Sequence, residues 1–143
     1  MSTILSKSRF AFATLATIIL GLSSGLAMAV DLKVTLKGDE ETPAVTTSAS
    51  GSGTITIAAD KSVSGSVTTS GLTGTMAHIH LAAPGKNGPA IITLTKTSDN
   101  VWSIPAGAKL TDEQYDAYKA GNLYVNVHSD AHKPGEIRGQ LKP

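Results

Sequence analysis

All four histidines of this 143-residue chain lie in two short motifs. The first reads Met76-Ala-His78-Ile-His80, and the second reads Asn126-Val-His128-Ser-Asp130-Ala-His132. Neutral imidazole is a good ligand for copper and zinc, and together the two motifs offer up to four ring nitrogens. The spacing therefore makes His78, His80, His128 and His132 candidate metal ligands.

Both motifs place histidines on the polar side of a predicted strand. Side chains two residues apart in a strand point to the same face, so His78 and His80 share one face while Ile79 takes the apolar one. In the second motif, the apolar Val127 points to the core and His128 points outward. If the two strands are neighbours, imidazoles from both motifs converge on the outer wall of the sheet. A metal site depends on this convergence.

Two further residues are candidate ligands beside the histidines. Met76 shares the face of His78 and offers a soft thioether that suits Cu(I). Asp130 could supply an oxygen ligand, or it could accept a hydrogen bond that orients a ligating imidazole. A purely structural interpretation stays open, because imidazoles also tie loops to backbone carbonyls and methionine often only fills space. The preferred metal is copper, and zinc comes second.

The sequence offers little for other kinds of chemistry. It contains no cysteine, which excludes thiolate-bound zinc, iron–sulfur clusters and thiol catalysis. No nucleophile–base motif, phosphate-binding loop or carboxylate pair is found, so no catalytic residue and no organic cofactor is assigned. No basic patch is interleaved with aromatic residues, so nucleic acid is not an expected partner.

The first 29 residues have the pattern of an export signal. Lys7 and Arg9 precede an uncharged, mostly apolar run over residues 10–22, and Ala27-Met28-Ala29 offers small residues for a cleavage site. The run is shorter than the roughly 20 apolar residues that span a bilayer, which disfavours a membrane anchor. We predict a signal peptide over residues 1–29 and an extracytoplasmic protein, periplasmic or secreted, with no membrane span after signal cleavage.

The remaining residues 30–143 are predicted to form one domain. Without Lys7 and Arg9, 10 basic residues face 11 acidic ones, so the formal charge of this part is −1 rather than the +1 of the whole chain. Because the chain has no cysteine, burial and sheet hydrogen bonds must stabilise the domain without disulfides.

Alternation of apolar and polar residues predicts mostly strands in this domain. The strands cover residues 31–37, 51–58, 62–69, 76–81, 90–95, the stretch around 101–102, 122–127 and 136–141. One helix is predicted over residues 112–120, with a capping box from Thr111 and Gln114 at its start and Gly121 after its end. The fold class is therefore all-β: an antiparallel β-sandwich or a flattened Greek-key barrel, such as a superoxide-dismutase-like one, with one short helix.

Several motifs together resemble a known family. The stretch Leu36-Lys-Gly-Asp-Glu-Glu-Thr-Pro43 is similar to the opening motif of the CHRD (chordin-type) domain family, with Ala44 in place of a second proline. Three later stretches resemble the later motifs of the family in the same order. They are Ala77-His-Ile-His80, Leu123-Tyr-Val-Asn-Val-His128 and His132-Lys-Pro-Gly-Glu-Ile-Arg-Gly-Gln-Leu141. The resemblance covers about residues 31–142 and implies a single-domain, exported bacterial member of the family. It implies an extracytoplasmic β domain and leaves the chemistry open.

Three functions are compatible with these observations. The first is a non-catalytic metal-binding module that uses His78, His80, His128 and His132. The second is a metal-free module that contacts an extracytoplasmic protein or a polymer, as the family resemblance also allows, because chordin binds secreted growth factors. The third and least favoured is a dismutase-like copper oxidoreductase, which needs an open coordination position that the sequence does not reveal.

Overall fold

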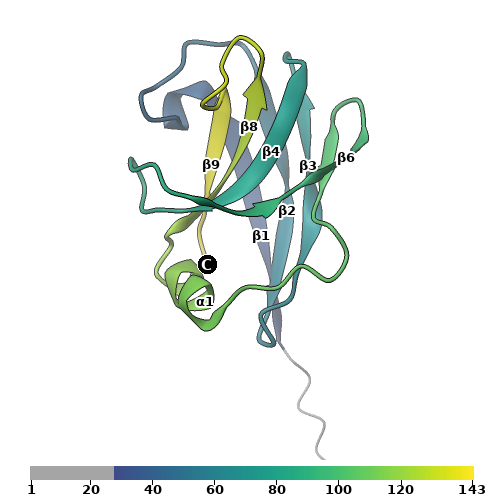
Figure 1. Cartoon of the computed structure of the whole chain (residues 1–143), viewed down its shortest axis with the longest axis vertical. Helices are drawn as coiled ribbons and strands as arrows, with labels where there is room; N and C mark the ends of the chain where they lie inside the picture. Colours follow the sequence, from purple (N-terminus) through teal and green to yellow (C-terminus); the bar gives the residue numbers. More distant parts are fainter. Residues whose placement is uncertain (1–27) are drawn as a thin grey trace, which may run out of the picture.

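The computed structural model describes residues 28–143 (Figure 1). Apart from Met28 and Ala29, the predicted signal peptide lies outside the described residues and stays a prediction. Ala29 already belongs to the first strand, where it pairs with Ala58. Within the described part of the chain, no helix is long and apolar enough to cross a bilayer.

Nine strands of the described residues form one antiparallel sheet in the order β5-β4-β8-β9-β1-β2-β3-β7-β6. Their bounds are β1 (Ala29–Lys37), β2 (Ser50–Ala58), β3 (Val63–Ser70), β4 (Gly74–Leu81), β5 (Ala90–Thr93), β6 (Thr95–Ser98), β7 (Val101–Ser103), β8 (Leu123–Ser129) and β9 (Ile137–Leu141). The last strand, β9, therefore lies between β8 and the first strand, so the C-terminal strand pairs with the N-terminal one.

The sheet folds over into two layers that enclose the core. In Figure 1, β4, β8 and β9 cross in front of β1, β2 and β3. The layers join where β9 meets β1, with Lys37 opposite Arg138. On the other side, β5 and β6 are consecutive, so one stretch of chain runs from the edge beside β4 to the edge beside β7. The all-β prediction is confirmed: the molecule is a nearly closed, barrel-like sandwich.

Leu94 forms the corner between β5 and β6. Its side chain is buried, and its backbone N–H donates to the Ala77 carbonyl of β4 at 2.9 Å. After this corner the chain pairs with β7, with Thr95 opposite Ser103. The sequence predicts one strand over residues 90–95 and misses β6, because every residue of β6 is exposed and none is apolar.

Alternating apolar residues build the core. Leu32, Val34 and Leu36 of β1 are buried, and the residues between them are exposed. Across the core, the Trp102 ring of β7 lies so close to Gly74 of β4 that a Cβ atom at Gly74 would come within 2.8 Å of it. A glycine is therefore needed where these strands approach each other, because the packed interior leaves no free volume for a side chain.

Strand β8 is buried on both faces, which the sequence does not predict. Leu123 and Val127 face the core, whereas Asn126 and His128 lie on the opposite, polar face and are also buried. The loop of residues 130–136 covers this face and contacts both polar side chains. The expectation that the polar face forms an outer wall is therefore corrected: the face is polar, but loops shield it from solvent.

The helix α1 (Asp112–Lys119) begins where predicted and ends one residue earlier. The Thr111 hydroxyl accepts from the Gln114 N–H at 3.2 Å, and the Gln114 side-chain oxygen accepts from the Thr111 N–H at 3.0 Å. These bonds complete the predicted capping box, and Gly121 follows the helix at φ 76°. The turn after β1 contains a 3-10 helix, η1 (Gly38–Glu40), with two acidic residues in its first turn.

Candidate metal site

Strands β4 and β8 are direct neighbours, so the two histidine motifs meet. In the antiparallel register, Met76 lies opposite His128, and His78 lies opposite Asn126. Opposed residues of an antiparallel pair project to the same face of the sheet. His78, His80 and His128 are therefore brought to one side of the two strands.

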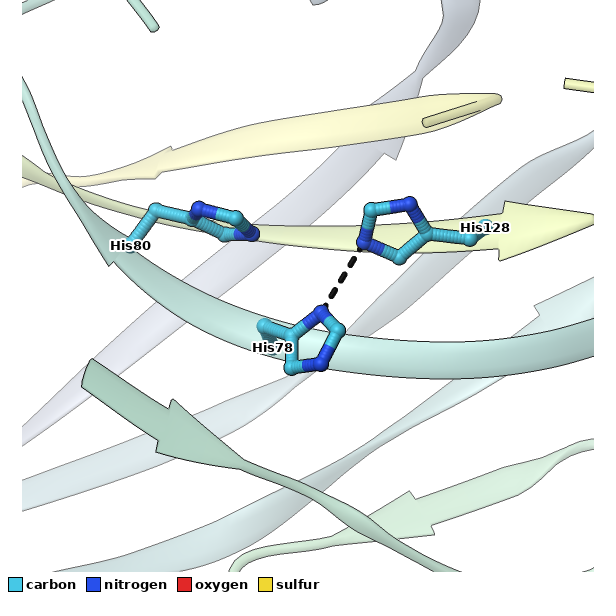
Figure 2. A group of neighbouring side chains, drawn as sticks. All are labelled: His78, His80 and His128. Atoms are coloured by element: carbon cyan, nitrogen blue, oxygen red, sulfur yellow. Dashed lines mark hydrogen bonds between the residues drawn. The ribbon is translucent and has the colours of Figure 1, made fainter. Parts of the chain in front are cut away.

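Three imidazoles gather on this face. One ring nitrogen from each of His78, His80 and His128 lies within 4.8 Å of the other two. Figure 2 shows the three rings turned toward one another across β4 and β8. The ring centroid of His78 is 5.4 Å from that of His80 and 4.9 Å from that of His128. We call these residues the three-histidine group.

Backbone carbonyls fix the ring protons of two members of the group. The Nδ1 atom of His80 lies 2.9 Å from the Gly88 carbonyl, and Nδ1 of His128 lies 2.8 Å from the Lys133 carbonyl. A carbonyl only accepts, so both Nδ1 atoms carry the proton and donate. Both Nε2 atoms then carry a lone pair instead of a proton, which is the arrangement that metal-binding histidines use.

The lone pair of His80 has no partner among the described residues. Its Nε2 atom is buried and makes no hydrogen bond there. The Nε2 lone pair of His128 instead accepts from Nδ1 of His78, at 2.9 Å. An ion can replace this shared hydrogen only after His78 moves its proton from Nδ1 to Nε2 or turns its ring.

The surroundings favour the neutral form of His78 and His80. Burial lowers the pKa of His78, and the neighbouring His128 and His80 lower it further. Burial is also the main cause that lowers the pKa of His80, and His128 and the charge of Arg138 lower it further. The hydrogen bond to the Gly88 carbonyl acts in the opposite direction and raises it. Neutral rings keep their lone pairs near pH 7, which metal binding requires.

Two residues that the sequence did not single out as site residues hold His80 in place. The Tyr124 ring stacks on the His80 ring, with centroids 4.8 Å apart and an interplanar angle of 3°. The Arg138 guanidinium carbon lies 3.5 Å from the centroid of the Tyr124 ring. Arg138 also donates to the Lys86 carbonyl at 2.8 Å, and so anchors the loop of residues 82–89 that carries Gly88.

A buried amide completes the site. Asn126 is 2% exposed, and its Oδ1 atom has no hydrogen-bond partner among the described residues. The strand register places Asn126 opposite His78, on the same face as the three histidines. The alternation of β8 carries the signal that finds Tyr124 and Asn126, because they are spaced two apart from each other and from His128 on one strand.

The other three predicted ligands occupy different places. His132 is not part of the group and lines a separate cavity together with Glu41. Met76 lies opposite His128 but is 51% exposed, and Asp130 is exposed in the loop after β8. The assignments of His132, Met76 and Asp130 as ligands stay predictions.

Comparison with known families gives one match. The model of the CHRD domain family matches residues 32–141, a range that contains both histidine motifs and every strand after β1. No similar curated protein and no similar solved structure is found.

Proposed function

Because the chain belongs to the CHRD domain family and carries a group of three histidines, we propose that it is an exported, non-catalytic metal-binding module. Copper is the first choice of ion and zinc the second. The observation that carries this proposal is the convergence of three ring nitrogens within 4.8 Å, two of them with lone pairs fixed by carbonyl hydrogen bonds.

The ring nitrogens are nearly close enough to share one ion. An ion held at about 2.0–2.1 Å from each nitrogen keeps tetrahedral ligand atoms about 3.3 Å apart. Nδ1 of His78 and Nε2 of His128 are 2.9 Å apart, and all three nitrogens lie within 4.8 Å. An ion shared by all three rings therefore needs them to draw together, and it needs His78 to give up its hydrogen bond to His128.

Three imidazoles leave a coordination position for a fourth ligand. Asn126 offers a buried amide oxygen, and Met76 offers a thioether on the same face of the sheet. A thioether favours Cu(I), whereas an oxygen ligand suits zinc or Cu(II) better. His132 can join only if the 130–136 loop moves, because its present position faces another cavity. The fourth ligand therefore decides which ion is preferred.

Titration of Cu(I), Cu(II) and Zn²⁺ into the purified protein, followed by calorimetry, tests the proposal. We expect one ion per chain, and we expect the triple variant H78A/H80A/H128A to lose it. Affinity should fall as the pH drops below about 6.5, because protonated imidazole cannot bind a metal. The lowered pKa of His78 and His80 moves this loss to lower pH than for free imidazole. Stoichiometric binding in the triple variant contradicts the proposal.

A metal-free module that binds an extracytoplasmic protein or polymer is the second candidate. His80 and His128 each hold a loop to the sheet through a carbonyl, which is also what purely structural histidines do. Thermal unfolding distinguishes the candidates, since an ion that binds only the folded state raises the melting temperature. A melting temperature that is equal in copper and in chelator supports the metal-free module.

A further inference from the structure

A second cavity, separate from the three-histidine group, lies where three loops meet. Its volume is about 210 Å³, and its walls come from the loops of residues 38–49, 82–89 and 130–136. The side chains that matter here are Glu41, Pro43, Val45, Asn87, His132 and Pro134. We call it the Glu41 cavity.

Glu41 is a buried acid that forms no ion pair with the described residues. Its side chain is 8% exposed, and its only side-chain hydrogen bond among the described residues is a long one, 3.5 Å from Asn126 Nδ2 to Oε1. The ion pairs found in the described part of the chain, Lys61–Asp112 and Lys119–Asp116, lie elsewhere. An ionised carboxylate can accept several hydrogen bonds, and buried charges in proteins are normally paired.

The backbone holds this acid against the cavity. A Cβ atom at Gly135 would clash with Oε1 of Glu41, so a glycine is needed for the close approach of the loop to the carboxyl group. Gly135 also has φ 139°, a conformation that L side chains rarely adopt. The backbone at Gly135 and the burial of Glu41 thus both limit the space that is left to the carboxyl group.

The walls of the cavity complement a short aliphatic chain with a positive end. Pro43, Val45 and Pro134 provide apolar surface, and Glu41 provides a hydrogen-bond acceptor that becomes negative when it ionises. The volume equals that of about seven water molecules and lies below the roughly 300 Å³ of small drug sites. The cavity thus fits a fragment of a few carbon atoms.

We propose that the Glu41 cavity binds a primary alkylammonium group, with Glu41 as its counter-ion. The group could belong to a free short-chain amine or to a lysine side chain of a partner polypeptide. Both sources present the same chemistry to the cavity: three N–H donors and one positive charge on a flexible chain. This inference is independent of metal binding by the three-histidine group.

NMR titration of the isotope-labelled protein with n-butylammonium tests the proposal, with n-butanol as the neutral probe of similar shape. A chelator is present throughout, so a metal at the histidines cannot produce the signal. We expect n-butylammonium to shift the backbone amide signals of His132 and Gly135, and n-butanol to bind at least about tenfold more weakly, because it lacks the charge-assisted hydrogen bonds. Equal binding of the two probes, or no shift at the cavity, overturns the proposal.

Two variants assign the effect to the buried acid. Glu41→Gln keeps the shape of the side chain but removes its charge, and we expect it to weaken n-butylammonium binding about tenfold or more. Glu40→Gln is the matched control, because Glu40 is the adjacent acid and is exposed. Unchanged binding in Glu41→Gln overturns the proposal.

A pair of peptides distinguishes a lysine side chain from a free amine as the source of the ammonium group. A lysine-containing peptide is compared with the same peptide carrying norleucine in place of lysine. Lysine-dependent binding tighter than that of n-butylammonium assigns the cavity to a polypeptide partner. Binding of n-butylammonium without any lysine-dependent peptide binding assigns it to free amines.

Discussion

Buried in the loop after β1, the Glu41 carboxyl group has a pKa of about 7, because burial disfavours its charged form. The same group in the unfolded chain has its ordinary pKa of 4.5. Between these two values the unfolded state loses its proton while the folded state keeps it. The free energy of unfolding should therefore decrease as the pH rises from about 4.5 to about 7.

We expect Glu41→Gln to stabilise the protein at about pH 8, because glutamine resembles the protonated acid and has no charge to bury. The gain should be up to about 3 kcal/mol, as the shift of the Glu41 pKa implies, and should disappear near pH 4. Urea unfolding at the two pH values measures it, with Glu40→Gln as the control. A pH-independent loss of stability would instead indicate that the carboxylate has a stabilising partner. Stability gained together with lost amine binding is typical of a functional site.

The role of His132 differs between the sequence-based prediction of the metal site and the site that the structure forms. The motif spacing predicts it as a ligand, whereas the three-histidine group does not include it. We expect His128→Ala to lower copper affinity by about a hundredfold or more, since even outer-shell partners of a ligand contribute 10- to 100-fold. His132→Ala should change the affinity little. Equal losses in the two variants, measured by competition with a copper chelator, would indicate that the 130–136 loop closes over the ion.

At the scale of elements, alternation was a good guide wherever one face of a strand is exposed. Leu32, Val34 and Leu36 alternate with exposed residues in β1, and the strand was predicted almost to its bounds. The capping box at Thr111 similarly marks the start of α1. Strand β6 was missed because its residues, Thr95–Ser98, have no apolar member to give a pattern. Burial of the polar face of β8 was missed because distant loops cause it.

The corner at Leu94 is the element on which closure of the sandwich depends. We expect Leu94→Ala to lower the free energy of unfolding by about 2–5 kcal/mol, through lost burial and the cavity left at the corner. The exposed neighbour Thr95 is the control, and its replacement by alanine should change stability by less than about 0.5 kcal/mol. Chemical denaturation measures both. Similar small losses in the two variants would show that the corner contributes little to closure.

At the scale of the whole molecule, the candidate site joins segments that are far apart in the chain. His78 and His128 are separated by 50 residues, and they meet only because β4 and β8 are neighbours in the sheet. The sequence predicts both strands and the face of each histidine, but local patterns do not encode the order of strands. The same reason explains why the Glu41 cavity was not foreseen: its walls come from three loops that only the complete fold brings together.

The make-up of the three-histidine group has a consequence for the oxidation state of a bound copper ion. All three of its members are imidazoles, which bind a metal in the neutral form, and the cationic Arg138 lies behind Tyr124 on the same face. The three-histidine group contains no anionic ligand that would neutralise the positive charge of a bound ion at this partly buried position. A cupric ion leaves two positive charges uncompensated there, whereas a cuprous ion leaves one. If copper binds at this group, electrostatics alone favours the reduced ion and should raise the redox potential of the bound copper.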